Sequence, residues 1–302
     1  MWLKILRSLY LAARRLLLGT GISFLPPFSW VKKAALRRLR GNGRVPVLGS
    51  WMRRDPGDRL NLGVNGVYEP VDTAFVGRVV RPGDTVVDVG ANIGYYTCFM
   101  ARLVGPAGRV VAFEPAPDLI GILRDNVVHN GYANVQVENR AVTETTGPLT
   151  LYMEDGRPED NRIFSDGEGE RTAQPVQGVR LDDVPVLKEH PPTFIKMDIQ
   201  GAEILALRGM RRVLKESPEV CVLLEYWPYG LIRAGFRPED LVEELHAAGL
   251  EVCRVADDGD LVPVAIGQLK DLCGEGKGQY INLVAAPPAR MRSLTADPHP
   301  SE

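Results

Sequence analysis

A glycine loop that follows an apolar strand carries the clearest chemistry in this sequence. Residues 85–97 read TVVDVGANIGYYT, in which an apolar run contains Asp88 and is followed by Gly90 and Gly94. This order is typical of a buried parallel strand that turns tightly into a helix beside a bound ligand. The two glycines allow the backbone to turn and to approach that ligand where a side chain would collide.

The spacing within this loop indicates the kind of ligand. A dinucleotide site reads G-x-G-x-x-G and holds a pyrophosphate at a helix N-terminus. Here the spacing is G-x-x-x-G, with Asn92 between the glycines, and the Asp88 carboxylate would repel a phosphate. An acceptor in this position suits a ligand with an amino group and a sulfonium charge and without phosphate. We therefore expect S-adenosyl-L-methionine as the cofactor.

A second acidic residue supports the same cofactor. Residues 109–115, RVVAFEP, form another apolar run that ends on Glu114. An acid at the tip of the strand after a glycine loop commonly accepts hydrogen bonds from both ribose hydroxyls. The competing interpretation is a solvated carboxylate at a strand end.

Charged residues also stand in the later motif FIKMDIQGAE, residues 194–203. Lys196 and Asp198 are two positions apart, so they share one face of a buried strand, and Glu203 opens the next helix. Buried charges need partners, and this pair suits orienting an acceptor hydroxyl or accepting its proton. A structural ion pair is the competing interpretation, with Glu203 as a first-turn helix acid.

Candidate residues for the acceptor side follow the next apolar run. VCVLLEYWP places Glu225 at a strand end, followed by Tyr226 and Trp227, which would line an acceptor pocket or form an aromatic lid over the core. The polar segment 154–174, with Arg162 near its centre, interrupts the regular pattern. Such a long loop suits a substrate-facing lid or a mobile surface excursion.

The elements that must position these residues alternate along the chain. Strands are predicted over 85–89, 109–113, 134–142, 193–199 and 220–225, and helices over 95–104, 117–130, 202–215 and 238–248. This alternation predicts a parallel sheet with helices on both faces, and ligands of such sheets bind beyond the carboxyl ends of the strands. Residues 250–255 and 279–285 are predicted to form a terminal antiparallel hairpin.

Several motifs together resemble one family. Six motifs occur in a fixed order along the chain: DVGANIGYYT, FEP, the helix end Asn126–Asn130–Gly131, LDD at 181–183, IKMDIQGAE and LLEYWP. Over roughly residues 60–230 the chain resembles the FkbM family of S-adenosylmethionine-dependent methyltransferases. The resemblance implies the Rossmann-like class I methyltransferase fold, with a seven-stranded, mostly parallel sheet and a C-terminal antiparallel pair. It also implies an O-methyltransferase that acts on a hydroxyl of a sugar, glycolipid or secondary metabolite.

The resemblance also implies roles for individual residues. The cofactor-binding set would be Asp88, Gly90, Asn92, Gly94 and Glu114. Asp198 and Glu203 match the family's D-[VI]-E-G-A-E signature, from which this chain departs because Gln200 replaces the usual Glu. Catalysis would then depend on Asp198, held by Lys196, or on Glu225.

Two other classes of function are compatible with parts of the sequence. A nicotinamide-dependent oxidoreductase would need the missing G-x-G-x-x-G spacing, and Asp88 argues against it. A catalytically silent cofactor-binding protein or membrane-associated scaffold is compatible with Gln200 and with the basic N-terminal segment.

Charge is distributed unevenly along the chain. Residues 1–54 contain twelve Lys or Arg and no acidic residue, whereas the rest contains 24 basic and 38 acidic residues. An acidic body argues against a nucleic-acid partner. On a helical wheel, residues 2–18 separate a basic sector from an apolar one. Residues 2–40 are therefore expected either to contact the inner face of a membrane peripherally or to pack on the domain as a helical cap.

The remaining composition bounds the compartment and the domain plan. The four cysteines stand far apart without metal-ligand spacing, which indicates a reducing, cytoplasmic location and predicts no metal site. We expect a basic amphipathic helical extension over 1–54, a methyltransferase domain over 55–286 and a disordered tail over 287–302, where no periodicity is visible.

Overall fold

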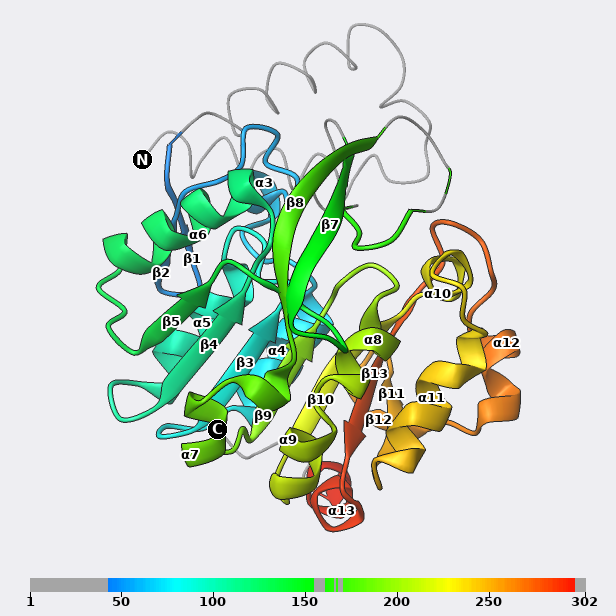
Figure 1. Ribbon diagram of the computed structural model, residues 1–302. Helices are drawn as coiled ribbons and strands as arrows, with labels where there is room; N and C mark the ends of the chain where they lie inside the picture. Colours follow the sequence, from blue (N-terminus) through cyan, green and yellow to red (C-terminus); the bar gives the residue numbers. More distant parts are fainter. Residues whose placement is uncertain (1–42, 155–160, 166, 168–170, 297–302) are drawn as a thin grey trace, which may run out of the picture. The chain divides into compact units, whose positions relative to one another are not determined.

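The computed structural model describes residues 43–154, 161–165, 167 and 171–296 (Figure 1). The chain divides into two compact units, Met1–Tyr68 and Glu69–Glu302. The expected boundary after residue 54 therefore falls inside the first unit. The basic segment 2–40 lies outside the described residues, so its helix and its membrane contact stay predictions.

A short hairpin and one helical turn make up the described part of the first unit. Strands β1 (Val45–Val47) and β2 (Ser50–Met52) pair in antiparallel fashion. Leu48 and Gly49 connect them with left-handed backbones, which is the geometry of a two-residue hairpin turn. Helix α3 (Leu62–Asn65) follows.

Eight strands form the main sheet of the second unit, in the order β12-β11-β13-β10-β9-β3-β4-β5. Their bounds are β3 (Thr85–Val89), β4 (Arg109–Phe113), β5 (Val135–Glu138), β9 (Phe194–Met197), β10 (Cys221–Tyr226), β11 (Glu251–Val255), β12 (Leu261–Pro263) and β13 (Ile281–Ala286). Neighbouring strands from β5 to β10 are parallel, whereas β13 runs antiparallel to both β10 and β11. This arrangement confirms the predicted fold class, and β12 adds an eighth strand at the edge.

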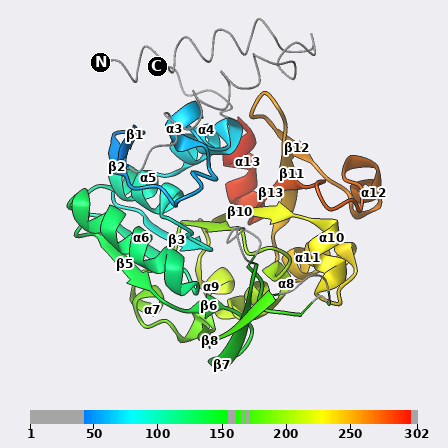
Figure 2. The ribbon, with the colours of Figure 1, turned by 90° about the horizontal axis from the view of Figure 1, so that it is seen from above.

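Helices cover both faces of this sheet. Figure 2 shows α8, α9 and α11 on one side of it and α4 and α13 on the other. The helices are α4 (Pro70–Val79), α5 (Tyr95–Val104), α6 (Pro117–His129), α7 (Val186–Glu189), α8 (Glu203–Arg208), α9 (Arg211–Glu216), α10 (Pro228–Arg233), α11 (Pro238–Ala247), α12 (Leu269–Leu272) and α13 (Pro288–Ala296), with 3-10 turns η3 (Leu181–Asp183) and η4 (Ile266–Gln268). No helix among the described residues is long and apolar enough to span a bilayer.

A second, three-stranded sheet emerges from the segment between β5 and β9. Its order is β6 (Ala141–Val142), β8 (Arg171–Val179) and β7 (Gly147–Glu154), with β7 and β8 forming a long antiparallel hairpin. Figure 1 shows this hairpin extending well beyond the main sheet.

Three predicted elements differ from the structure for identifiable reasons. The strand expected over 134–142 is divided between β5 and β6, which belong to different sheets. The helix expected over 202–215 breaks after α8, because Gly209 packs so tightly that a Cβ there would lie 2.0 Å from the Thr143 carbonyl oxygen. The expected disordered tail instead begins with helix α13, which buries Met291 and Leu294.

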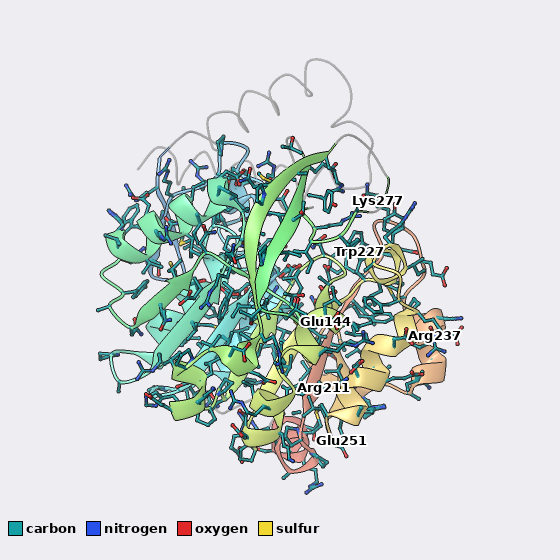
Figure 3. All side chains as sticks on the ribbon, viewed as in Figure 1. Glu144, Arg211, Trp227, Arg237, Glu251 and Lys277 are labelled. Atoms are coloured by element: carbon teal, nitrogen blue, oxygen red, sulfur yellow. The ribbon has the colours of Figure 1, made fainter. Side chains whose placement is uncertain are left out.

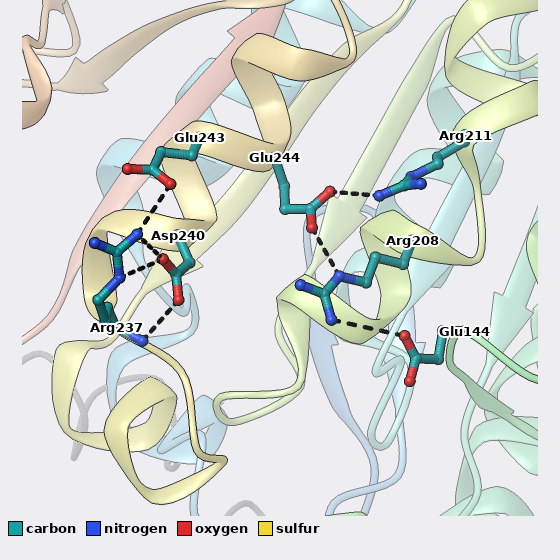
Figure 4. A network of polar contacts seen from close by, with 7 residues as sticks. All are labelled: Glu144, Arg208, Arg211, Arg237, Asp240, Glu243 and Glu244. Carbon is teal, nitrogen blue, oxygen red and sulfur yellow. Dashed lines mark hydrogen bonds and ion pairs between the residues drawn. The ribbon is translucent and has the colours of Figure 1, made fainter.

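Ion pairs on the surface join the helices of one face (Figure 4). Glu244 on α11 accepts hydrogen bonds from Arg208 at 2.7 Å and from Arg211 at 3.0 Å, and Arg208 also lies 3.8 Å from Glu144. Another group around Arg237 is centred on the start of α11. Exposed pairs of this kind contribute up to about 1 kcal/mol each, so they support the packing of α8 and α9 on α11 without determining it.

Candidate active site

One face of the main sheet carries polar side chains near the carboxyl ends of its central strands. Asp88 on β3 is paired directly with Lys196 on β9, and Glu225 on β10 is paired with Asn282 on β13. The alternate residues of these strands point into the hydrophobic core on the opposite face. Strand register therefore gathers side chains from four strands at one edge, where open α/β sheets bind their ligands.

The loop after β3 is constrained by the packing of the protein itself. Gly90 and Gly94 have φ values of +82° and +90°, and Asn92 also has a left-handed backbone, with φ of 51°. A Cβ at Gly90 would lie 2.0 Å from the carbonyl oxygen of Asp198, and one at Gly94 would lie 2.5 Å from the Leu123 side chain. The glycines are thus required by neighbouring protein atoms and by the turn, whatever ligand the loop approaches.

Glu114 clamps this loop from the end of β4. Its Oε2 accepts a hydrogen bond from the Asn92 backbone N–H at 2.8 Å, and its Oε1 accepts one from Ala116 N–H at 2.9 Å. Burial raises the pKa of Glu114 to about 7, although both backbone hydrogen bonds act in the opposite direction. Each carboxylate oxygen has a further lone pair, so Glu114 can still accept hydrogen bonds from a ligand.

Asp88 is buried beside the loop, and its two carboxylate oxygens differ in their hydrogen bonds. Its Oδ2 accepts a hydrogen bond from the Thr97 hydroxyl at 2.5 Å. Its Oδ1 has no hydrogen-bond partner among the described residues. Burial raises the pKa of Asp88 to about 6. A buried acceptor without a donor is costly, and a ligand N–H would satisfy it.

Asp198 and Glu225 lie together around one amide group. Lys196 Nζ lies 3.2 Å from Asp198 Oδ2, and Gln200 Nε2 donates to Asp198 Oδ1 at 2.9 Å. The same Gln200 nitrogen lies 3.4 Å from Glu225 Oε2. Burial raises the pKa of Glu225 well above its ordinary value, and the charges of Asp198 and Glu203 raise it further.

Two further acids around Lys196 were not predicted from the sequence. Tyr96 donates its hydroxyl to Glu69 at 3.0 Å, and Asn282 donates to Asp72 at 2.6 Å. Burial raises the pKa of both acids, and the positive charge of Lys196 opposes that shift. The Lys196 ammonium also lies 5.0 Å from the Tyr96 ring centroid. The unusual left-handed backbone of Glu69 is invisible in the sequence, where this residue simply precedes a helix.

The pKa of Lys196 shows which charges dominate this group. Burial lowers it, but the negative charges of Asp198, Glu69, Asp88 and Glu225 outweigh burial, so that the pKa is raised overall. Lys196 therefore stays cationic at neutral pH.

Glu203 points back into its own turn. Its Oε1 accepts a hydrogen bond from the Ile199 backbone N–H at 3.1 Å, and its side chain is completely buried. Burial raises the pKa of Glu203 to about 7. This geometry matches the interpretation of Glu203 as an acid that stabilises the helix start, close to Glu225 but bonded within its own turn.

The aromatic residues after β10 face in different directions. Tyr226 lies in the hydrophobic core, on the opposite face from Glu225, so the structure does not bring it to the polar group. Trp227 does lie at the strand end, where its indole N–H donates to the Lys277 carbonyl at 3.0 Å (Figure 3). The Arg162 guanidinium lies 5.0 Å from the Trp227 ring centroid and 6.0 Å from that of Phe164. The segment that follows β7 is therefore in contact with this end of the sheet.

The assembled groups suit a cationic ligand. Carboxylates outnumber the ammonium of Lys196, so this edge repels phosphate and attracts sulfonium and ammonium groups. Oδ1 of Asp88, which has no hydrogen-bond partner within the described part of the chain, and the remaining lone pairs of Glu114 offer acceptors to N–H and hydroxyl donors. Within the described ranges, no three His, Cys, Asp or Glu side chains are grouped so as to hold a metal ion.

Comparison with known families settles the class of protein. Residues 88–249, more than half of the chain, match the family model described as "Methyltransferase FkbM domain". The chain belongs to the FkbM methyltransferase family. The predicted resemblance to this family is confirmed.

Relatives of this FkbM-family chain come from diverse organisms. It is 29% identical over 151 residues to "Methyltransferase 1" of Beauveria bassiana. The matched region covers 43% of this chain and 59% of that protein. It is 46% identical over 78 residues to "31-O-demethyl-FK506 methyltransferase FkbM" of Streptomyces tacrolimicus, covering 25% of this chain and 29% of the other. It is 28% identical over 188 residues to "Hexuronic acid methyltransferase AglP" of Haloferax volcanii, covering 59% and 69%.

A solved structure can also be compared with this FkbM-family member. The precorrin-6y C5,15-methyltransferase of Geobacter metallireducens is 16% identical, with a TM-score of 0.42 over 73% of this chain and 88% of the other. The chain spans only 59% of the length of the Beauveria relative and less than a third of that of the Streptomyces relative.

Proposed function

We propose that this methyltransferase transfers the methyl group to a hydroxyl of a sugar, glycolipid or secondary metabolite. The observation that carries the proposal is the pairing of Asp198 and Glu225 around Gln200, next to the glycine loop. Two carboxylates at this edge can orient a hydroxyl and accept its proton. Two relatives support parts of this acceptor class by their printed names: one names a hexuronic acid, which is a sugar acid, and the other names an O-demethyl compound, which indicates transfer to oxygen.

The cofactor would bind along the loop between β3 and α5. We propose that Asp88 accepts a hydrogen bond from the amino group of the cofactor and that Glu114 accepts those of the ribose hydroxyls. The loop between these two acids would contact the cofactor through Gly90, Asn92 and Gly94. When bound, S-adenosyl-L-methionine supplies an activated methyl group and a positive charge that the surrounding carboxylates stabilise.

The two carboxylates of the pair would have different tasks. Both oxygens of Asp198 already accept hydrogen bonds, one from Lys196 and one from Gln200, so this side chain is held in place. Glu225 is buried, has a raised pKa and, among the described residues, receives only the longer contact from Gln200. We therefore assign the orientation of the hydroxyl to Asp198 and the acceptance of its proton to Glu225.

Arg162 and Trp227 would contribute to the acceptor side. Trp227 follows Glu225 directly in the sequence, and the Arg162 guanidinium lies over its ring. A planar cation on an aromatic face forms a wall that can pack against a sugar ring or another flat acceptor.

Transfer of a labelled methyl group tests the proposed reaction. The full chain is incubated with S-adenosyl-L-methionine labelled in its methyl group and with a glycan and lipid extract of the source cell. We expect label in a product that survives mild base, because methyl ethers survive it and methyl esters do not. Label released by base, or found on an amine, would contradict O-methylation of a hydroxyl.

The variant Asp198→Asn tests where the reaction takes place. We expect it to bind the cofactor with a Kd within about threefold of the wild type while transfer slows by about 100-fold or more. Calorimetry measures the binding and the label measures the transfer. Lost cofactor binding would make Asp198 a cofactor or folding residue instead.

We also propose that the basic segment 2–40 contacts an anionic membrane surface. The support is its charge, with twelve basic and no acidic residues in 1–54. Flotation with phosphatidylserine liposomes tests this in the full chain, compared with a variant in which Lys4, Arg7, Arg14 and Arg15 are replaced by Gln. Equal flotation of the two proteins would overturn the membrane contact.

A further inference from the structure

We propose that Gln200 is a positioning residue that holds Asp198 and Glu225 as one pair by donating an amide hydrogen to each carboxylate. The proposal deepens the assignment of the transfer site and rests on it for its catalytic consequence. Its structural part, the bridge between two acids, can be tested without any activity.

The geometry of the bridge is specific to an amide. Gln200 Nε2 lies 2.9 Å from Asp198 Oδ1 and 3.4 Å from Glu225 Oε2. A side-chain NH₂ group has two hydrogens, so one nitrogen can serve both carboxylates. A glutamate at this position would offer acceptors only and would place a third negative charge between the other two.

The backbone around Gln200 fixes the direction of its side chain. Gln200 has φ of 57° and Gly201 has φ of +96°, so two consecutive residues adopt left-handed conformations. A Cβ at Gly201 would lie 2.5 Å from the Gly230 backbone on α10. On the other side, the Asp198 carbonyl oxygen lies against Gly90. The turn is wedged between the glycine loop and α10, and such strained backbones concentrate at functional sites.

The charges around Glu225 explain why a neutral donor is useful there. Asp198, Glu203 and Glu69 face it with negative charge, and Lys196 faces it with positive charge. Burial raises the pKa of Cys273 and of Tyr280 in the segment before β13, and the negative charge of Glu225 raises both further. The Lys196 ammonium bonds Asp198 rather than Glu225 among the described contacts. Gln200 therefore provides Glu225 with a hydrogen-bond donor and keeps Asp198 beside it.

The consequence concerns the proton of the acceptor hydroxyl. A carboxylate close to a second carboxylate binds a proton more tightly than it would alone. Gln200 holds the two together and limits their repulsion, which favours the ionised form of Glu225 that can take the proton.

The test compares Gln200→Glu and Gln200→Ala with the wild type, and uses Gln177→Glu as control. Gln177 is exposed on β8, so its substitution makes the same chemical change away from the acids. In the cofactor-free protein, a raised carboxyl pKa means that the folded state binds the proton more tightly, so stability falls as pH rises. We expect the decrease in unfolding free energy to continue to a pH about one unit higher in Gln200→Glu than in the wild type. This shift corresponds to a tenfold change in the proton affinity of the carboxyl group.

Activity provides the second readout. We expect the ascending limb of the kcat/KM profile to move to higher pH by about one unit in Gln200→Glu, whereas a merely structural residue would lower the rate without moving the limb. If Gln200→Glu does not fold, Gln200→Ala is expected to show both shifts in weaker form. Profiles of both Gln200 variants that match Gln177→Glu would overturn the proposal. If the wild type transfers no methyl group at all, the proposed reaction fails, and the stability arm alone decides about Gln200.

Discussion

Buried acids next to the glycine loop have to serve the fold and the ligand at once. Glu114 is bonded by two backbone N–H groups and is only 6% exposed. Burial brings its pKa to about 7. The protonation state of Glu114 therefore changes near neutral pH, and ligand binding through this residue should depend on pH.

We expect Glu114→Gln to weaken cofactor binding by about 10- to 100-fold, because a hydrogen bond to a charged group contributes about 1.5–3 kcal/mol. In the wild type, affinity should rise as pH increases through about 7, where the carboxyl loses its proton. In the variant this dependence should flatten. Calorimetric titration with S-adenosylhomocysteine across this range measures both effects.

An exposed glutamate on α7 provides the control for this experiment. Glu189→Gln removes a carboxylate from the surface and should leave affinity and its pH dependence unchanged. A Glu114→Gln protein that binds as tightly as this control at every pH would rule out the ribose contact.

Strand alternation makes several individual site residues predictable from the sequence, whereas others depend on tertiary packing. Asp88, Lys196 and Glu225 stand in apolar runs with a period of two, so their common face follows from the sequence. Glu69 and Asp72 depend on how α4 packs over the sheet, which no local pattern contains. The sequence leaves Tyr226 either in an acceptor pocket or over the core, and strand alternation places it in the core.

Among the elements, the turn between β9 and α8 determines the position of the acid pair. It approaches the glycine loop at Gly90 and α10 at Gly230, with no room for a Cβ at the contacts. The three segments are therefore packed directly against one another. This explains why the acid pair lies beside the cofactor loop although about a hundred residues separate them in the sequence.

We expect Gly201→Ala to destabilise the protein by about 3 kcal/mol, since it combines a left-handed backbone with a collision against Gly230. Gly121 on α6 provides the matched control, because nothing lies within 4 Å of a Cβ there. Gly121→Ala should stabilise the protein by about 0.5–1 kcal/mol as a helical substitution. Urea unfolding measures both. Equal stability of the two variants would contradict the wedged turn.

Elements with one uninterrupted pattern were predicted closely, whereas breaks in tertiary packing were missed. Strands β3 and β4 and helix α5 agree with their predicted ranges. The separation of β5 from β6 and the break after α8 arise where the chain meets the small sheet, at Thr143 and Gly209. Such breaks depend on contacts between distant segments, so periodicity cannot reveal them.

For the whole molecule, the main electrostatic feature is an acidic edge inside a stable α/β frame. Burial raises the pKa of Asp88 to about 6 and those of Glu114 and Glu203 to about 7. Burial also raises the pKa of Glu225. These groups bind protons more tightly in the folded than in the unfolded state, so their ionisation opposes folding.

We therefore expect the unfolding free energy of the cofactor-free protein to fall as pH rises from about 5 to 8, at about 1.4 kcal/mol for each unit by which a folded-state pKa is raised. Urea unfolding at several pH values measures this. Saturating S-adenosyl-L-methionine should recover part of the loss, because a cationic ligand binds the folded state. Stability that increases with pH over this range would contradict the buried acidic edge.

The overall fold was predictable because strand and helix patterns alternate regularly and several motifs belong to one family. The eighth strand and helix α13 were not predicted, since β12 has three residues and α13 has little amphipathic pattern. Both depend on surfaces that the rest of the molecule provides.

We propose that the acid pair at the strand ends activates a hydroxyl for methyl transfer. Single-turnover transfer by Glu225→Gln, at saturating labelled S-adenosyl-L-methionine and with the acceptor found in the extract assay, tests it most directly. Saturation removes any effect on cofactor affinity, and the amide keeps the shape of the side chain while it cannot take the proton. We expect the rate to fall by about 100-fold or more. A rate within about twofold of the wild type would contradict the account.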